Sequence, residues 1–338
     1  MKTQPAPRCL LCGNDGVRRY SGLKDRMFET PGEWTLVECR DHNCGLLWLD
    51  PMPAPEDIHQ AYRQYYTHGE ITRDSWARRI YHAVRAAYLS NHFGYPSNAG
   101  IPLLPRLLAS LAAWVPHLAV RFDASVMWLR AKPQGRLLEI GCGRGDLLHH
   151  LSRLGWEVQG IDPDPKAAAT ARERGLNVSC GSLESVSFAD ESFDAIIMSH
   201  VIEHLYDPIA TVRECHRILK SGGRLVLLTP NTGSLGHSKY GRNWLHLDPP
   251  RHLHLFNMAN LPKIARNLRF SRMECFSVIR DADWTLGASR QIEREGKYKM
   301  GRLPFLTRVW GYWLMYVERL VLAFNPGRGE EIVFLAEK

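Results

Sequence analysis

The sequence lacks any apolar run long enough to span a bilayer, which takes roughly 18 to 20 residues in a helix. The longest candidates are residues 107–120, interrupted by Pro116, and residues 309–317, which end at Glu318. The opening stretch, MKTQPAPRCLLCG, also has no apolar core of a secretory signal peptide. We therefore expect a cytoplasmic protein, with peripheral contact to the inner face of the membrane left open.

Cysteine is scarce, at eight residues in 338. In a reducing compartment these are thiols or metal ligands and not a disulfide framework. Internal repeats and low-complexity tracts are absent as well, and the 45% hydrophobic content excludes a largely disordered chain. The net charge of +8 suits a negatively charged partner such as nucleic acid or an anionic membrane, or simply a soluble surface, and does not choose among them.

Glycine is concentrated in the stretch RLLEIGCGRGDLLHHL, residues 136–151. An apolar segment runs into Gly141, Gly143 and Gly145, and a helical pattern follows. Glycine lets the backbone turn tightly and approach a ligand closely. In folds that alternate strands and helices, ligands lie beyond the carboxyl ends of the strands, so this turn is a candidate binding site.

The spacing of these glycines departs from the dinucleotide-binding pattern G-x-G-x-x-G. Asp146 stands where the third glycine would be, and its carboxylate would repel a pyrophosphate. Glu139, which leads the turn, suits a ligand with a positive centre and an amino group. Asp162, in VQGIDPDP, is placed to accept hydrogen bonds from a ribose diol.

From residue 136 onward, short apolar runs alternate with helical patterns. This alternation predicts an α/β fold with a seven-stranded, doubly wound, Rossmann-like sheet. The predicted strands are residues 136–140, 157–161, 177–179, 193–198, 224–228, 273–280 and 331–335, and the predicted helices are 146–154, 165–174, 208–219 and 258–268. Before this domain (136–338) we expect a Cys-rich module (1–55) and a helical, basic and apolar segment (56–135).

Four motifs, LLEIGCGRG, GIDPDP, FDAIIMSHVIEHLYDP and RILKSGGRLVLLTPN, occur in this order. In that order and spacing, residues 136–338 resemble the class I S-adenosylmethionine-dependent methyltransferases. The resemblance implies that S-adenosyl-L-methionine is the cofactor. It also implies that Glu139, Gly141 and Gly143 surround the methionine portion and that Asp162 holds the ribose, and Gly145 is assigned to cofactor binding with them.

The resemblance is incomplete where the adenine would bind. Many members of the family have an aspartate after the third strand, whereas this chain has Ser182. Ser182, Glu184 or the backbone at Leu183 are the alternatives for this contact. The stretch MSHVIEHL follows the fourth strand and would face the transferring methyl group, so His200 is assigned to the cofactor site.

Two short cysteine pairs, Cys9-x2-Cys12 and Cys39-x4-Cys44, each have a glycine just after them. Four thiolates on small turns suit tetrahedral zinc, although His42 could replace one of the second pair. The segment also resembles the zinc-ribbon leader of a subset of bacterial methyltransferases of polysaccharide or secondary-metabolite pathways, a pattern that includes Tyr62, Tyr65 and Tyr66. We expect a structural zinc ion held by Cys9, Cys12, Cys39 and Cys44.

A segment without predicted regular structure, residues 229–256, contains four histidines. Their spacing matches no compact metal motif, so acceptor recognition and proton removal are favoured over a second metal. His252 is the first candidate for the base and His204 the second, because histidine titrates near neutral pH. The alternatives are that His252 only fixes the loop and that His204 caps the adjoining helix.

Two apolar segments flanked by arginine, residues 101–122 and 303–324, remain. The second lies in an insertion before the last strand, residues 282–329. Either the two segments pack on each other as an ordinary subdomain, or they lie in a membrane interface or grip a lipid. A lipid-linked saccharide acceptor would fit the second option.

The functional prediction is methyl transfer to a small-molecule or lipid-linked acceptor, at a sugar or phenol hydroxyl. One alternative is a ribosomal RNA methyltransferase, since some of these carry a zinc ribbon and the chain is basic. Nucleic acid is disfavoured because the N-P-P-F/Y type signature is absent and the arginines form no stripe. The other alternative is a cofactor-binding scaffold without catalysis. Oxygen versus nitrogen or carbon as acceptor atom, and the oligomeric state, stay open.

Overall fold

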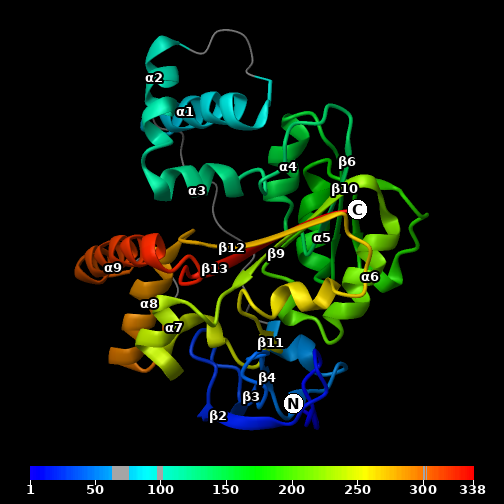
Figure 1. The fold of residues 1–338 in the computed structure, drawn as a ribbon, viewed down its shortest axis with the longest axis vertical. Coiled ribbons are helices and arrows are strands. Elements are labelled where there is room, and N and C mark those ends of the chain that lie inside the picture. The colour runs from blue at the N-terminus through cyan, green and yellow to red at the C-terminus, as the bar shows by residue number, and fades with distance from the viewer. Residues whose placement is uncertain (63–75, 97–101, 300, 302) are drawn as a thin grey trace. The chain divides into compact units, whose positions relative to one another are not determined.

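The computed structural model describes residues 1–62, 76–96, 102–299, 301 and 303–338 (Figure 1). Tyr65 and Tyr66 lie outside these residues. The chain forms two compact units, each assembled from three segments. Unit 1 consists of residues 1–65, 199–213 and 227–335, and unit 2 of residues 66–198, 214–226 and 336–338. The domain boundaries expected at residues 55 and 135 stay a prediction; within unit 1, residues 47–49 form hydrogen bonds with residues 253–255.

The main sheet has seven strands in the order β12-β13-β10-β9-β6-β7-β8, which confirms the predicted fold class. The strands are β6 (Arg136–Ile140), β7 (Glu157–Asp162), β8 (Val178–Cys180), β9 (Phe193–Ser199), β10 (Leu219–Pro230), β12 (Arg272–Val278) and β13 (Glu331–Glu337). Strand β6 pairs in parallel with both β7 and β9. The chain therefore winds outward in both directions from β6, and a ligand crevice is expected at that point of reversal.

Local signals explain the helices that cover the parallel strands of unit 2. Helix α4 (Asp146–Arg153) begins directly after Gly145, whose φ is 78°. Helix α5 (Pro165–Glu173) starts with proline at a position that needs no N–H donor, and the Asp164 carboxylate accepts a hydrogen bond from the Lys166 N–H. Helix α6 (Pro208–Ile218) follows in the same manner after Asp207, whose carboxylate accepts from the Ala210 N–H.

The helix predicted at residues 258–268 is wrong. The structure has only a short 3-10 helix there, Leu261–Ala265. The Asn257 carboxamide oxygen accepts hydrogen bonds from the backbone N–H groups of Ala259 and Asn260, and Pro262 has no N–H to donate. Side-chain bonds of this kind compete with the hydrogen bonds of an α-helix, which explains the error.

Unit 1 contains a second, antiparallel sheet of four strands in the order β11-β4-β3-β2. These are β2 (Gly16–Leu23), β3 (Trp34–Cys39), β4 (Leu47–Leu49) and β11 (His254–Leu255), and a separate pair is formed by β1 (Thr3–Gln4) and β5 (Met52–Pro53). His254 pairs with Trp48, and the Trp48 ring is buried with Leu36 and Leu49. Residues far apart in sequence thus complete one sheet.

The remaining helices belong to the two units separately (Figure 1). Unit 2 has α1 (Trp76–Phe93), α2 (Leu103–Ala112) and α3 (Pro116–Ala124), and unit 1 has α7 (Leu235–Tyr240), α8 (Ala282–Glu295) and α9 (Phe305–Phe324). Helices α8 and α9 meet closely, because a Cβ at Gly311 would lie 2.1 Å from the Asp283 carbonyl oxygen. In unit 2, the Tyr88 hydroxyl donates to Asp123 and so joins α1 to α3.

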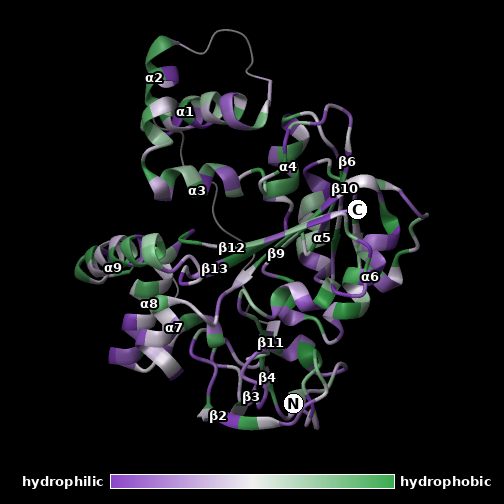
Figure 2. Ribbon diagram, viewed as in Figure 1, coloured by the Kyte–Doolittle hydropathy of each residue, from purple (hydrophilic) through white to green (hydrophobic). Residues whose placement is uncertain are grey.

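Helices α2 and α9 expose many apolar side chains, and Figure 2 colours much of both helices as hydrophobic. On α9 the exposed large residues are Phe305, Leu306, Val309, Tyr312, Trp313, Tyr316, Leu320 and Phe324. On and beside α2 they are Leu103, Leu104, Leu107, Leu111 and Trp114. No described helix is by itself long and apolar enough to cross a membrane, although α2 and α3, bent by 105°, pass that test as a pair.

Candidate cofactor and acceptor sites

The glycine turn of unit 2 has the backbone that its sequence predicts. Gly141, Gly143 and Gly145 have φ values of 71°, 54° and 78°, which side-chain-bearing residues rarely adopt. A Cβ at position 145 would lie 2.3 Å from Leu176, whereas a Cβ at position 143 would meet nothing within 4 Å. Gly145 therefore permits close packing, and Gly143 borders open space where a ligand can approach.

Asp162, at the end of β7, supports this turn. One carboxylate oxygen accepts the Gly143 N–H at 2.7 Å, and the other accepts the Asp164 N–H at 2.9 Å. Burial raises the pKa of Asp162, and the two hydrogen bonds oppose that rise. The carboxylate is thus oriented at the carboxyl end of the sheet, next to the neighbouring strand end that holds the glycines.

Glu139 provides the sharpest indication that a ligand belongs here. Its Oε2 atom is buried and has no hydrogen-bond partner among the described residues. Burial, reinforced by Asp162, raises its pKa well above the usual range. A buried, unsatisfied carboxylate is costly, and a ligand ammonium group would relieve that cost. These residues therefore fit the amino-acid end of S-adenosylmethionine, and we call Glu139, Gly141, Gly143, Gly145 and Asp162 the cofactor edge.

The other end of the predicted cofactor site is less defined. Leu183 is buried and begins a short 3-10 helix after Ser182, whose carbonyl accepts the Ser185 hydroxyl at 2.7 Å. The adenine contact assigned to Ser182 or Leu183 stays a prediction. Asp146 forms ion pairs with Arg144 and Arg174, at 2.6 and 2.7 Å, so its charge is largely neutralised. The argument from pyrophosphate repulsion is correspondingly weaker.

A second group of polar residues gathers in unit 1, and we call His200, Glu203, His204, His246 and His252 the histidine cluster. His200 follows β9 with a φ of 54°. Burial lowers its pKa, but the hydrogen bonds and charges of Glu203 and Glu331 outweigh burial and raise the pKa to about 9. His200 is thus an imidazolium at neutral pH.

Both ring nitrogens of His200 face carboxylates of its own unit. Nε2 lies 2.7 Å from Glu331 and Nδ1 lies 3.2 Å from Glu203. Glu331 also accepts from Arg280 at 3.1 Å. The predicted contact between His200 and the cofactor stays a prediction, and the ion pairs show that His200 has a second role in organising unit 1.

The two candidate bases lie side by side. The rings of His204 and His252 are 4.7 Å apart between centroids and are inclined by 72°. The Nδ1 of His252 donates to the His246 carbonyl at 2.7 Å, and the Nδ1 of His204 donates to the Arg251 carbonyl at 3.0 Å. The Tyr62 hydroxyl lies 3.0 Å from the same His204 nitrogen. His204 does not cap α6, so that alternative is wrong.

The charge state of His204 follows from its surroundings. Burial, aided by His252, lowers its pKa to about 4, so the ring is neutral at pH 7. The neighbouring Glu203 has a pKa of about 2, because the bonds from His200 outweigh the effect of burial. Both Nδ1 atoms face carbonyl oxygens, which can only accept. Nε2 of the neutral His204 therefore carries the lone pair, whereas Nε2 of His252 lies 3.8 Å from the Asp248 carboxylate.

The segment that carries His252 is held by a buried ion-pair network. Arg251 donates to both oxygens of Asp25 at 2.7 Å, to Asp248, and to the Ala61 carbonyl. Burial raises the pKa of Asp25, but Arg251 outweighs it and the pKa falls to about 2. The prediction that residues 229–256 lack regular structure is partly wrong, since they contain α7, two 3-10 turns and β11.

The four front cysteines come together as predicted. One sulfur from each of Cys9, Cys12, Cys39 and Cys44 lies within 4.8 Å of the others. The shortest separations are 3.3 Å between Cys12 and Cys39 and 3.6 Å between Cys9 and Cys44. Four sulfurs at these distances can surround a tetrahedral zinc ion. His42 is not part of this group.

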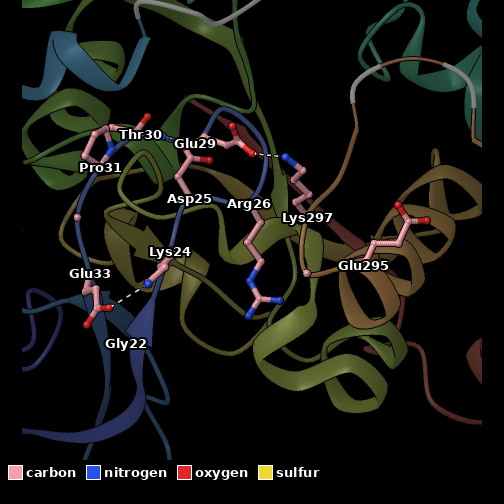
Figure 3. A pocket seen from close by; sticks show the side chains of 12 residues that line it. Gly22, Lys24, Asp25, Arg26, Glu29, Thr30, Pro31, Glu33, Glu295 and Lys297 are labelled. Atoms are coloured by element: carbon pink, nitrogen blue, oxygen red, sulfur yellow. Dashed lines mark hydrogen bonds and ion pairs between the residues drawn. The ribbon is translucent and has the colours of Figure 1, made fainter.

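A shallow hollow of about 650 Å³ lies in unit 1 beside the β2–β3 connection (Figure 3). Its rim charges pair with each other, Lys24 with Glu33 at 3.2 Å and Lys297 with Glu29 at 2.5 Å. Asp25, also in its lining, is engaged with Arg251. None of the predicted cofactor or acceptor residues lines this hollow, so it offers no chemistry for the predicted reaction.

Comparison with known proteins finds similarity to methyltransferases. Residues 111–271 match the family model described as a methyltransferase domain. The ubiquinone biosynthesis O-methyltransferase of Cereibacter sphaeroides is 35% identical over 127 residues, which cover 35% of this chain and 51% of that protein. The protein of the same name from Xanthomonas oryzae pv. oryzae is 40% identical over 103 residues, covering 28% and 43%.

Among solved structures, phosphoethanolamine N-methyltransferase 2 of Haemonchus contortus in complex with S-adenosyl-L-methionine has a TM-score of 0.47. It is 19% identical, over 86% of this chain and 62% of that one. The chain spans about half the length of the curated relatives it matches. The match to the methyltransferase domain model includes the cofactor edge and strands β6 to β10.

Proposed function

We propose that this protein transfers a methyl group from S-adenosylmethionine to a hydroxyl group of a small or lipid-linked molecule. The observation that carries the proposal is the unsatisfied Glu139 oxygen beside three left-handed glycines and the oriented Asp162 carboxylate. Glu139 would pair with the ammonium group of the cofactor, and Asp162 would accept from its ribose hydroxyls. The relatives are named O-methyltransferases, which supports oxygen as the acceptor atom.

The histidine cluster supplies what the acceptor hydroxyl needs. As the oxygen attacks the methyl carbon, the bond from carbon to sulfur breaks and its electron pair stays on sulfur, giving a neutral thioether. The hydroxyl proton must leave to a base. Nε2 of the neutral His204 is unprotonated, the His252 ring lies against it, and the Glu203 carboxylate beside them stabilises a positive charge formed there. The cluster is therefore suited to proton removal in a site shielded from water.

The chemical class of the acceptor is proposed as a sugar or phenol hydroxyl. The imidazole rings of the cluster, with Tyr62 and Trp244 beside them, favour a flat or ring-shaped molecule over a nucleic-acid strand. Among the described residues the arginines nearest the cluster, Arg251 and Arg280, are engaged with Asp25, Asp248 and Glu331. They are thus committed to carboxylates and not presented to phosphates, which disfavours the RNA alternative.

The four-cysteine site is proposed to hold a structural zinc ion. Its ligand set is complete without water, so the metal would have no position open for substrate. Zinc would fasten the turns that carry β2 and β3, whose small sheet has little core of its own. We propose that zinc content and methyl transfer are separable, because no residue of the cofactor edge contributes to the metal site.

The exposed apolar face of α9 supports a proposal of peripheral membrane contact on the cytoplasmic side. Leu, Phe, Trp and Tyr side chains line it, and Arg308 and Arg319 lie on the same helix. Aromatic residues beside arginine are typical of helices that lie in the lipid headgroup region. Sedimentation with vesicles containing anionic lipid tests this, with Trp313→Glu expected to reduce the bound fraction.

The deciding experiment follows labelled methyl from S-adenosylmethionine into separated lipid, polysaccharide, RNA and small-molecule pools. Label is expected in the lipid or small-molecule pool, bound through oxygen and therefore stable to amine-specific reagents. Asp162→Ala is expected to abolish transfer while zinc content stays the same. Label in RNA would overturn the acceptor class. Binding of the cofactor without label in any pool would favour the scaffold alternative.

A further inference from the structure

Three residues of the histidine cluster form a group that the methyl-transfer proposal does not fully explain. Glu203, His204 and His252 each offer one potential ligand atom, and these atoms lie within 4.8 Å of one another. Glu203 and His204 belong to the 3-10 turn after β9 (Ile202–His204), and His252 belongs to the segment of residues 229–256. Two imidazoles and one carboxylate are the ligand set of three-residue sites for first-row divalent metals.

Glu203 provides an independent indication that a ligand binds here. The residue is fully buried, and its Oε1 atom has no hydrogen-bond partner among the described residues. His200 lies 3.2 Å from this oxygen but does not satisfy it with hydrogen-bond geometry. The other oxygen, Oε2, accepts the Thr229 hydroxyl at 2.9 Å. The carboxylate is thus fixed by a hydrogen bond at Oε2, whereas Oε1 has, within the described part of the chain, only the His200 ion pair.

The outer contacts of the three residues match those of metal ligands. A metal-bound histidine usually donates its other ring N–H to a carbonyl or carboxylate, which fixes the tautomer and the ring orientation. His252 donates Nδ1–H to the His246 carbonyl, and His204 donates Nδ1–H to the Arg251 carbonyl. Nε2 of His204 is left for another partner, and Nε2 of His252 lies 3.8 Å from the Asp248 carboxylate. Arg251 is itself immobilised by Asp25 and Asp248.

We propose that Glu203, His204 and His252 bind a divalent first-row cation, distinct from the zinc of the cysteine site. Three protein ligands leave coordination positions open. Resting on the proposed methyl transfer, the inference places the acceptor hydroxyl at one such position. In this arrangement His204 and His252 would act as ligands in place of the base role given to them above. Coordination would acidify the acceptor hydroxyl, whose proton would pass to a water molecule, and the oxygen would then bond to the methyl carbon while the electron pair of the breaking bond passes to sulfur.

The two proposed metal sites can be separated by their chemistry. Manganese(II) has little affinity for a four-thiolate site, whereas imidazole and carboxylate accept it. The test therefore uses the full-length protein with its zinc content measured and with no cofactor or acceptor present. Titration with Mn²⁺, followed by the electron paramagnetic resonance signal of the free ion, is expected to show one bound Mn²⁺ per chain.

Substitutions test which residues bind the Mn²⁺ ion. Glu203→Gln and His252→Ala are each expected to weaken Mn²⁺ binding by at least about 10-fold. His254→Gln is the matched control, because His254 is also a buried histidine of this segment but bonds only to the Leu205 carbonyl through Nδ1. It is expected to bind Mn²⁺ like the wild type. Circular dichroism verifies that each variant is folded.

A measurement on the unmodified protein guards against misfolded variants. Pulsed electron paramagnetic resonance of bound Mn²⁺ is expected to show coupling to imidazole nitrogen, which a four-cysteine site cannot produce. Absence of Mn²⁺ binding at millimolar concentration, or bound Mn²⁺ without nitrogen coupling, would overturn the inference. So would unchanged affinity in both folded ligand variants.

The metal inference and the proposed function fail in different ways. Full methyl transfer in chelator-treated protein that keeps its zinc would disprove the second metal and leave the proposed function intact. Nitrogen-coupled Mn²⁺ in a protein that labels no acceptor pool would support the site and count against the function.

Discussion

The cofactor edge and the histidine cluster are built by different means. The cofactor edge uses residues between Glu139 and Asp162, and its key groups are backbone turns and two carboxylates at adjacent strand ends. The histidine cluster joins side chains from residues 200–204 and 246–252 and is supported by Tyr62 and Glu331. One region depends on local conformation, and the other on contacts between distant segments. This difference predicts separate effects on cofactor affinity and on turnover.

The largest effect is expected at the cluster. His204→Ala removes a group that either takes the acceptor proton or holds the ion that acidifies it, so turnover should fall by about 100- to 10,000-fold. Affinity for S-adenosylmethionine, measured by calorimetry, should stay within a factor of two or so of wild type, roughly the scatter of independent sites. Tyr62→Phe, which loses only the hydroxyl near the same ring, should have a smaller effect. If His204→Ala lost cofactor affinity by the same factor as turnover, the two regions would not have separate roles.

The second effect is at the cofactor edge. Asp162→Ala removes charge-assisted hydrogen bonds to the ribose, each worth about 1.5 to 3 kcal/mol, and releases the Gly143 N–H. Affinity for S-adenosylmethionine should fall by about 100-fold or more. Asp164→Ala is the matched control, because it removes a helix cap two residues away and should cost stability with little loss of affinity. Unchanged calorimetric binding in Asp162→Ala would contradict the assignment.

The third effect is on stability and is confined to unit 1. Asp25→Asn leaves Arg251 buried with Asp248 as its remaining carboxylate, which should lower the free energy of unfolding by about 3 kcal/mol. Glu33→Gln breaks only the exposed pair with Lys24 and should cost less than about 0.5 kcal/mol. Urea unfolding measures both. Similar losses in the two variants would show that the Arg251 network is not what holds the segment of His252.

The smallest effect concerns Glu318 on α9, outside both regions. Burial, reinforced by Glu330, raises its pKa well above 4.5 in the folded protein. The unfolded chain therefore releases this proton first, and the stability contribution is full below about pH 4.5 and declines as pH rises. Glu318→Gln should be more stable than wild type by about 1 kcal/mol at pH 8, with the gap closing toward pH 5. A gap independent of pH in thermal unfolding would contradict this account.

The strands of the main sheet could be predicted because their signals are local. Short apolar runs that alternate with helical patterns marked all seven, and β6 was placed to the residue. The error at residues 258–268 arose where the Asn257 side chain binds backbone N–H groups, a competition that periodicity does not reveal. The four-stranded sheet of unit 1 was not predicted, for a different reason. Its strand β11 has only two residues and exists through its pairing with β4.

The candidate site residues also differ in whether local sequence could identify them. Residues of the cofactor edge are close in sequence and follow strands, so a motif was sufficient to find them. His204 and His252 were singled out by their chemistry alone. Asp25, Glu331 and Arg280 were not, because their importance comes from ion pairs with residues more than fifty positions away. The ion-pair partner of a buried charged residue can be identified only from the folded structure.

The pairing of β4 with β11 also bears on synthesis. When the ribosome has delivered residues 1–55, the edge of β4 that will receive His254 and Leu255 is still without a neighbour. An unpaired strand edge invites association with other chains. The four-stranded sheet therefore cannot be completed until residues 254–255 have been synthesised, after the glycine turn and Asp162.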